Sequence, residues 1–250
     1  MPNAGVEFAK VSYALAGGHV LLCDVSLKLE QGKTTALLGR SGSGKTTLLR
    51  MVNGLVVPTS GEVWVGGWTV GVGNGLIGLR RGIGYVIQET GLFPHMTVER
   101  NAGMALELAG RPKEEIARRV EEVLGLVGMG FEEFRGRYPW QLSGGQRQRV
   151  GLARALAMDP DVLLMDEPLG ALDPMTRAEM QTMLRELLER VKKTVLLVTH
   201  DLGEALYLGD RVVFLEGGEV VADLAAGEVL GSDNAHVKGY VNAMHRVVKT

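Results

Sequence analysis

The chain has 250 residues, of which 46% are hydrophobic and 22% charged, an ordinary balance for a globular protein with a substantial core. Its net charge of −2 gives no overall attraction for nucleic acid. Cys23 is the only cysteine, which excludes an intrachain disulfide, and a lone cysteine is usually a small buried hydrophobe. The sequence shows no signal-peptide pattern and no apolar run of the ~18 residues that would span a bilayer. We therefore expect a cytoplasmic protein that reaches a membrane only through a partner.

The first seventy residues predict strands and one helix. Residues 6–30 alternate apolar and polar positions on either side of a glycine pair, which predicts two antiparallel strands. Residues 35–38 predict a short buried strand, and a helix is expected over 45–53. Trp64 and Trp68 flank a second glycine pair in a predicted hairpin, where we interpret them as capping a small core rather than stacking on bases.

Residues 39–46 read GRSGSGKT and fit the P-loop pattern G-x-x-x-x-G-K-[ST]. The glycines let backbone N–H groups approach phosphates, and the helix that follows points the positive end of its dipole at them. Lys45 is expected to contact the β- and γ-phosphates, and the Thr46 hydroxyl to ligate Mg²⁺. Because the motif lies between a predicted strand and a predicted helix, we interpret it as a nucleotide site rather than a structural turn.

The rest of the chain predicts a helical insertion and then further strands. Residues 97–138 have helical character, while 162–165 and 195–198 are unbroken apolar runs typical of parallel strands. Residues 176–191 predict a helix whose methionines and leucines face the core, and 211–222 predict a final hairpin. This alternation predicts an α/β fold with a mostly parallel sheet.

Three polar residues follow the predicted buried strands. Asp166 comes at the end of one strand, where a carboxylate beside a P-loop is suited to hold Mg²⁺ through water. Glu167 is one residue further and is a candidate general base for the attacking water. His200 follows the next strand at the edge where ligands bind in parallel sheets, so we expect it to contact the γ-phosphate.

A second glycine-rich turn, LSGGQ, occupies residues 142–146 and precedes an apolar helical pattern. Ser143 is expected to cap that helix, whose N-terminus can face an anion. Its close coupling to a long helix argues against a flexible linker. Since one chain needs one cradle per nucleotide, the second turn predicts a site shared between two copies.

As a set, these motifs resemble the ABC transporter ATPases over almost the full chain. Gln88 matches the glutamine loop of that family, Asp173 lies in the match to its D-loop, and His200 matches its switch histidine. The resemblance implies an α/β P-loop NTPase core with an N-terminal antiparallel β subdomain and an inserted helical subdomain. The core would comprise residues 1–88 and 156–250 and the helical subdomain about 89–155, with no C-terminal regulatory domain.

The resemblance also implies that the chain forms a head-to-tail dimer, either with a second copy or with a similar ATPase subunit. This dimer would bind two ATP molecules and Mg²⁺ at its interface. The catalytic residues would be Glu167, His200 and Lys45, and the residues near Mg²⁺ would be Thr46, Gln88 and Asp166. Asp173 would organise the opposite subunit. The nucleotide-binding set would be Gly39, Ser41, Gly42, Ser43, Gly44, Lys45, Thr46, Thr47, Gln88, Ser143, Gly144, Gly145, Gln146 and Asp173.

The sequence departs from the family at the position that commonly stacks on adenine. Leu15 or Ala16 occupies it, and Tyr13, the nearest aromatic residue, is two or three residues out of register. Stacking of a base on an aromatic ring contributes ~1–3 kcal/mol in nucleic-acid binding. Unless another ring substitutes, we expect weaker nucleotide binding or weaker base selectivity.

Residues 84–98, GYVIQETGLFPHMTV, resemble the ATPases of importers for quaternary amines such as glycine betaine, choline or carnitine. The implied partners are membrane permease subunits and, indirectly, an extracytoplasmic solute-binding protein, with no nucleic acid. The implied location is peripheral, on the cytoplasmic face of the cell membrane. The alternatives are an importer of amino acids or another small solute, a soluble ABC ATPase, and a nucleotide-binding module without hydrolysis.

Overall fold

The computed structural model describes residues 5–71 and 75–248, with side chains described up to residue 244. The chain forms two compact units. Arg81–Lys192 form one unit, and the described residues before and after that range form the other. Within the described residues, no helix has the length and apolar character that a membrane span requires.

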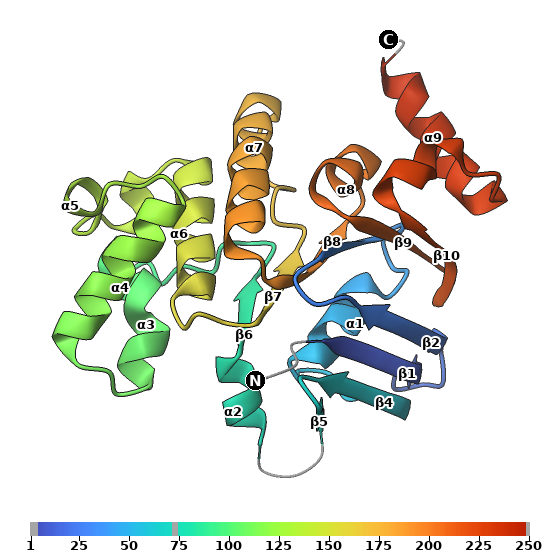
Figure 1. Ribbon diagram of the computed structural model, residues 1–250, viewed down its shortest axis with the longest axis horizontal. Helices are drawn as coiled ribbons and strands as arrows, with labels where there is room; N and C mark the ends of the chain where they lie inside the picture. Colours follow the sequence, from blue (N-terminus) through green and yellow to red (C-terminus); the bar gives the residue numbers. More distant parts are fainter. Residues whose placement is uncertain (1–4, 72–74, 249–250) are drawn as a thin grey trace. The chain divides into compact units, whose positions relative to one another are not determined.

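An antiparallel sheet opens the first unit. It contains β1 (Val6–Ala14), β2 (Val20–Leu29), β4 (Ser60–Val65) and β5 (Trp68–Thr69) in the order β2-β1-β4-β5. The strands lie side by side in Figure 1, where β1 is the partner of both β2 and β4. The predicted strand pair and hairpin are confirmed.

Two expectations about side chains in this sheet are wrong. Trp64 and Trp68 are 38% and 61% exposed, because strand alternation turns Val63 and Val65 inward instead. Cys23 also takes an outward position on β2 and is exposed. The tryptophans therefore do not cap a core, and Cys23 is not a buried hydrophobe.

A second sheet in this unit contains mostly parallel strands. β3 (Thr34–Leu38) lies between β8 (Thr194–Thr199) and β9 (Arg211–Glu216) and is parallel to both. β10 (Glu219–Ala225) pairs with β9 as an antiparallel hairpin. All residues of β3 and β8 are buried, as the unbroken apolar runs predict.

The helices of this unit pack on these sheets. α1 (Lys45–Val52) follows β3 and packs against β4 and β8. α8 (Leu202–Leu208) packs on β3, and α9 (Ala235–Val248) follows a short 3₁₀ turn at Ala226–Gly231. Val237 of α9 joins a buried cluster that also contains Ala36, Leu38 and Phe214. Figure 1 shows α8 and α9 above the red end of the sheet. α2 (Leu76–Arg81) ends at the boundary between the units.

The second unit joins two parallel strands to a group of helices. β6 (Ile83–Val86) pairs with β7 (Val162–Asp166). The helices α3 (Val98–Leu108), α4 (Lys113–Leu126) and α6 (Gly144–Leu156) pack on one another, as Figure 1 shows.

Two short elements and one long helix complete this unit. α5 (Phe131–Phe134) and a 3₁₀ turn (Pro139–Gln141) lead into α6. α7 (Pro174–Val191) follows β7 and buries Met180, Leu184, Leu187 and Leu188. The parallel strand pairs of both units and the antiparallel N-terminal sheet confirm the predicted α/β class.

Candidate functional site

The P-loop joins β3 to α1 and requires its glycines. Gly42 and Gly44 have φ angles of 81° and 97°, which favour glycine over other residues. A side chain at Gly39 would collide with the Leu215 carbonyl oxygen and come within 2.6 Å of the Ser43 Oγ atom. The glycines therefore let the loop backbone pack closely on Leu215 and Ser43. They also leave the backbone N–H groups without covering side chains.

The interior of this loop is prepared for an anion. Lys45 is only 5% exposed, and its ammonium group donates to the carbonyl oxygens of Gly39 at 2.8 Å and Arg40 at 3.0 Å. The Ser43 hydroxyl oxygen is buried and has no hydrogen-bond partner among the described residues. Gly44 caps α1 without a side-chain hydrogen bond. A buried hydroxyl without a partner beside a buried ammonium is an arrangement that a phosphate would complete.

His200 lies in a short turn that its neighbours fix. The Thr199 hydroxyl donates to the Glu204 carboxylate at 2.8 Å and accepts from the Asp201 N–H at 3.0 Å. The Asp201 carboxylate caps α8 by accepting from the Glu204 N–H at 3.1 Å. His200 itself is exposed at the end of β8, so its ring is presented from a rigid turn.

A cavity of about 500 Å³ brings His200 together with the P-loop residue Arg40. Glu216, His236 and Tyr240 line its other side. Tyr240 packs edge-on against Phe214, and burial together with the nearby Glu216 carboxylate raises the pKa of its hydroxyl.

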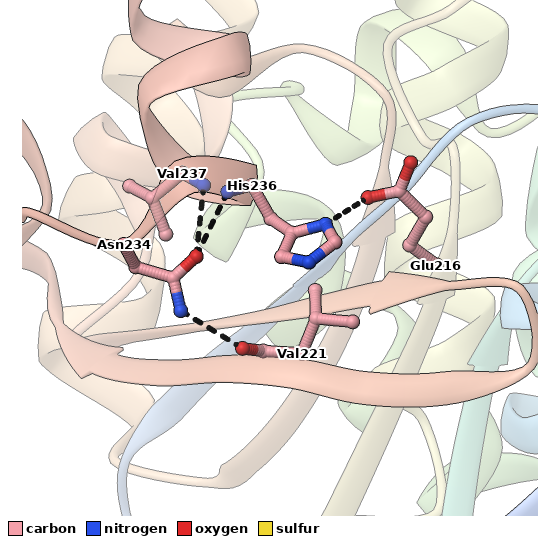
Figure 2. Close-up of polar contacts among 5 residues, drawn as sticks. All are labelled: Glu216, Val221, Asn234, His236 and Val237. Atoms are coloured by element: carbon pink, nitrogen blue, oxygen red, sulfur yellow. Dashed lines mark hydrogen bonds and ion pairs between the residues drawn. The ribbon is translucent and has the colours of Figure 1, made fainter.

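The start of α9 is fixed beside this cavity (Figure 2). The His236 Nδ1 atom lies 2.7 Å from the Glu216 carboxylate. The Asn234 side chain accepts from the His236 N–H at 2.9 Å and donates to the Val221 carbonyl at 3.1 Å. His236 thus connects the start of α9 to Glu216 at the end of β9.

Asp166 and Glu167 end β7 in the second unit. Asp166 is 3% exposed, and its carboxylate accepts from the Tyr85 hydroxyl at 3.4 Å. Glu167 has a φ angle of 44°, a left-handed conformation that is unusual for a residue with a side chain and is concentrated at functional sites. It is followed by buried Pro168, and its carbonyl accepts from the Gly170 N–H at 3.2 Å. These features fix the backbone conformation of Glu167 directly after β7.

The LSGGQ turn begins α6, and Ser143 caps the helix as predicted. Its hydroxyl accepts from the Gln146 N–H at 3.2 Å, while the Gln146 side chain accepts from the Ser143 N–H at 2.9 Å. This capping box leaves the Ser143 hydroxyl proton and the Gln146 amide protons as donors. A side chain at Gly145 would come within 2.8 Å of the Thr176 methyl group, so this glycine allows close packing on α7, whereas Gly144 has ordinary clearance.

Asp173 caps α7 by accepting from the Thr176 N–H at 3.1 Å. The Thr176 side chain and backbone hydrogen bonds hold the pKa of Asp173 below its ordinary value. Pro174 takes the first helical position, where its missing N–H is not needed.

Gln88 is exposed after β6, and the segment that follows it is connected to α6. Arg154 donates to the carbonyl oxygens of Thr90 at 2.8 Å and Gly91 at 2.7 Å. Burial lowers the pKa of Arg154. The guanidinium therefore links the helix of the LSGGQ turn to the segment after Gln88.

The sequence-predicted residues are divided between the two units. The P-loop and His200 belong to one unit and share a cavity, whereas Gln88, the LSGGQ turn, Asp166, Glu167 and Asp173 belong to the other. Sequence reasoning missed the supporting residues Tyr85, Arg154, Thr199 and Glu204. An arginine on an otherwise apolar helix face and a threonine at a strand end are signals too common in sequences to identify them.

Comparisons with known proteins identify the family of this chain. Residues 22–170 match the family model described as ABC transporter. The chain is 43% identical over 225 residues to the glycine betaine/carnitine/choline transport ATP-binding protein OpuCA of Bacillus subtilis, covering 90% of this chain and 59% of that protein. It is 45% identical over 242 residues to the sulfate/thiosulfate import ATP-binding protein CysA of Nocardia farcinica, covering 92% and 72%.

A solved structure supports the same relationship. The dimeric post-hydrolysis state of the ATP-binding cassette MJ0796 bound to ADP and Pi is 35% identical, with a TM-score of 0.79, covering 88% of this chain and 98% of that one. The chain spans little more than half the length of OpuCA. The family match and these identities show that the chain belongs to the ABC transporter family, as an ATP-binding domain of P-loop ATPase fold.

Proposed function

We propose that this chain is the ATP-hydrolysing subunit of an importer and acts as a head-to-tail pair. The observation that carries the proposal is the contrast between its two glycine-rich turns. One surrounds a buried ammonium and a buried hydroxyl without a partner, while the other is self-capped and presents its donors outward. An ATP bound in the first turn of one copy would be completed by the second turn of the other.

In this proposal the P-loop binds the triphosphate through backbone N–H groups and through Lys45. The Lys45 ammonium exchanges its bonds with Gly39 and Arg40 for phosphate oxygens, and the Ser43 hydroxyl gains an acceptor. The remaining phosphate contacts come from Gly39, Ser41, Gly42, Gly44, Thr46 and Thr47.

The side chains of Thr46, Asp166 and Gln88 suit Mg²⁺. They offer hydroxyl, carboxylate and amide oxygens, the hard ligands that Mg²⁺ prefers, and Asp166 is a buried acid that accepts a hydrogen bond from the neutral Tyr85 phenol. Bound Mg²⁺ would offset the negative charge of the β- and γ-phosphates.

Hydrolysis is assigned to residues of both units. Glu167, directed by its left-handed backbone, takes the proton of the attacking water, and His200 holds the γ-phosphate. Ser143, Gly144, Gly145 and Gln146 of the opposite copy contact the γ-phosphate, and Asp173 orders the facing turn. Loss of the γ-phosphate removes the bridge that keeps the pair closed.

The helical segment 89–155 would connect this cycle to a permease. Arg154 links the LSGGQ helix to Thr90 and Gly91. A movement of that helix on ATP binding or hydrolysis is therefore transmitted to the segment after Gln88. We place the pair on the cytoplasmic face of the membrane through permease subunits, which receive solute from an extracytoplasmic binding protein.

The proposed solute is a quaternary amine. The name of the OpuCA relative gives glycine betaine, carnitine and choline, and residues 84–98 carry the resemblance to that branch. The identity to CysA favours a second candidate, the import of another small solute such as an oxyanion. Uptake of radiolabelled choline, glycine betaine and sulfate by cells with and without the gene would separate the two.

The shared site can be tested by measuring the molecular mass of the Glu167→Gln variant in solution with ATP. Without its base the pair should bind ATP and stay closed, so light scattering should give about twice the monomer mass of 26.9 kDa with ATP and one monomer mass with ADP. A variant that binds ATP and remains monomeric would contradict the proposal.

A further inference from the structure

The hairpin beside the P-loop has no aromatic ring at the position expected to hold adenine. Leu15 lies in the turn after β1, where its N–H donates to the His19 carbonyl at 2.9 Å, and its side chain is 44% exposed. Val20 at the start of β2 is 54% exposed. Tyr13 pairs with buried Leu22 across the hairpin and is half-buried, so it lies away from the turn. At its turn this hairpin therefore offers the aliphatic side chains of Leu15 and Val20, with the exposed His19 imidazole between them.

A stacked pair of aromatic rings lies directly before the LSGGQ turn in the second unit. The rings of Tyr138 and Trp140 are 4.5 Å apart between centroids, with planes 10° apart. Trp140 is 66% exposed, while Pro139 between them is buried. An indole supported on one face by a phenol presents its other face to a second flat group.

Two successive capping arrangements fix these rings relative to Ser143. The Tyr138 N–H donates to the Gln141 side chain at 2.8 Å, and the Gln141 N–H returns to the Tyr138 carbonyl at 2.9 Å. Leu142 is buried, and its carbonyl accepts from the Arg147 guanidinium at 2.7 Å. Trp140 is therefore presented in a preorganised segment, which lowers the entropic cost of binding.

The spacing between Trp140 and Ser143 suits the two ends of one nucleotide. Three residues span about 6 Å along a 3₁₀ turn and about 10 Å when extended. The indole ring adds its own length to this separation. A serine at the γ-phosphate would thus leave the tryptophan beside the base.

We propose that Trp140 of one copy stacks on the adenine of the ATP held by the P-loop of the other copy. The ring that the first unit lacks at Leu15 is then supplied in trans by the same segment that supplies Ser143. This inference rests on the proposed head-to-tail pair. It adds Trp140 as the residue through which the pair recognises the adenine base of ATP. Exposed Trp140 would become buried there, as large aromatic side chains often are at interfaces.

The first test compares ATP-driven pairing of variants in the Glu167→Gln background by light scattering. Trp140→Leu should raise the ATP concentration needed for half-maximal pairing on the order of tenfold, and Trp140→Phe should raise it less because it keeps a ring. Trp68→Leu is the matched control, since Trp68 is similarly exposed at 61% but lies in the other unit, and it should have no effect. ATP binding to the monomer should be unchanged in all three variants.

The second test identifies which copy supplies the ring. With Trp64→Phe and Trp68→Phe, Trp140 is the only tryptophan of the chain. We place it on a Lys45→Ala subunit, which should bind no nucleotide, and mix this with a Trp140→Leu subunit that has an intact P-loop, both carrying Glu167→Gln. ATP should quench the Trp140 fluorescence in the mixture and leave the Lys45→Ala subunit alone unchanged.

Three outcomes would overturn the inference. If Trp140→Leu pairs at the same ATP concentration while Glu167→Gln still pairs, the shared site stands and the trans stacking fails. If His19→Ala raises the ATP requirement and Trp140→Leu does not, the ring belongs to the hairpin of the same copy. If Trp140→Leu weakens only assembly with the permease, Trp140 is a docking residue. Failure of Glu167→Gln itself to pair would instead overturn the proposed function, and the inference with it.

Discussion

The two glycine-rich turns that begin α1 and α6 differ in how many of their polar groups are hydrogen-bonded within the turn. At the P-loop, Gly44 caps α1 with no side chain, and Ser43 and Lys45 are buried inside the turn. At the LSGGQ turn, Ser143 and Gln146 cap α6 reciprocally on an exposed surface. The first start is left open for a ligand, whereas the second is complete before any ligand arrives.

This difference indicates that the two glycine-rich turns have different roles in binding ATP. A turn that holds a buried ammonium and a buried hydroxyl in need of a partner is suited to bind phosphate by itself. A self-capped turn has only its remaining donors to offer and needs a nucleotide that is already held. The LSGGQ turn should therefore contribute to pairing and little to the affinity of a single copy.

The largest effect is expected from Lys45→Ala. Removing the buried ammonium takes away the charge that faces the phosphates, so ATP binding to the monomer should weaken at least 100-fold, on the order of the loss of a charged hydrogen-bonding partner. Titration calorimetry measures this directly. Lys33→Ala is the control, because that lysine is exposed and pairs with Asp210. Undiminished binding in Lys45→Ala would refute the role given to the P-loop.

A smaller and more selective effect is expected from Ser143→Ala. Loss of the cap should cost ~1 kcal/mol of unfolding free energy. Thr97→Ala removes a similar cap from α3 and should cost a comparable amount. Only Ser143→Ala should also abolish ATP-driven pairing in the Glu167→Gln background while monomer binding stays intact. Equal pairing by the two variants would remove the distinction between the two helix starts.

The smallest effect concerns pH and Asp173. Its lowered pKa means that the ionised cap stabilises the fold above the ordinary Asp value of 3.8, and that this stability is lost as pH falls through the lowered folded value. Asp173→Asn keeps a capping side chain that does not titrate. Melting temperatures of the two proteins should be similar at pH 7, and the wild type should fall relative to the variant below about pH 4. Parallel melting curves across this range would show that the cap does not titrate.

The sequence predicts well what is encoded in consecutive residues. The P-loop, the Ser143 cap and the acids at the end of β7 each lie within one short segment whose chemistry is local. The contacts of Arg154 with Thr90 and of Thr199 with Glu204 depend on tertiary structure or on side-chain direction. The exposure of Trp64 and Trp68 was mispredicted because a hairpin pattern does not tell which alternate residues face inward.

The central claim is that each ATP is held by two copies, and mixing two inactive variants tests it most directly. In the Glu167→Gln background, Lys45→Ala lacks a working P-loop, and Ser143→Arg blocks the LSGGQ turn. Each alone should remain monomeric with ATP, whereas their mixture contains one intact composite site. Analytical ultracentrifugation should then show a heterodimer that binds one ATP. Pairing by either variant alone, or no pairing in the mixture although Ser143→Arg still binds ATP, would contradict the account.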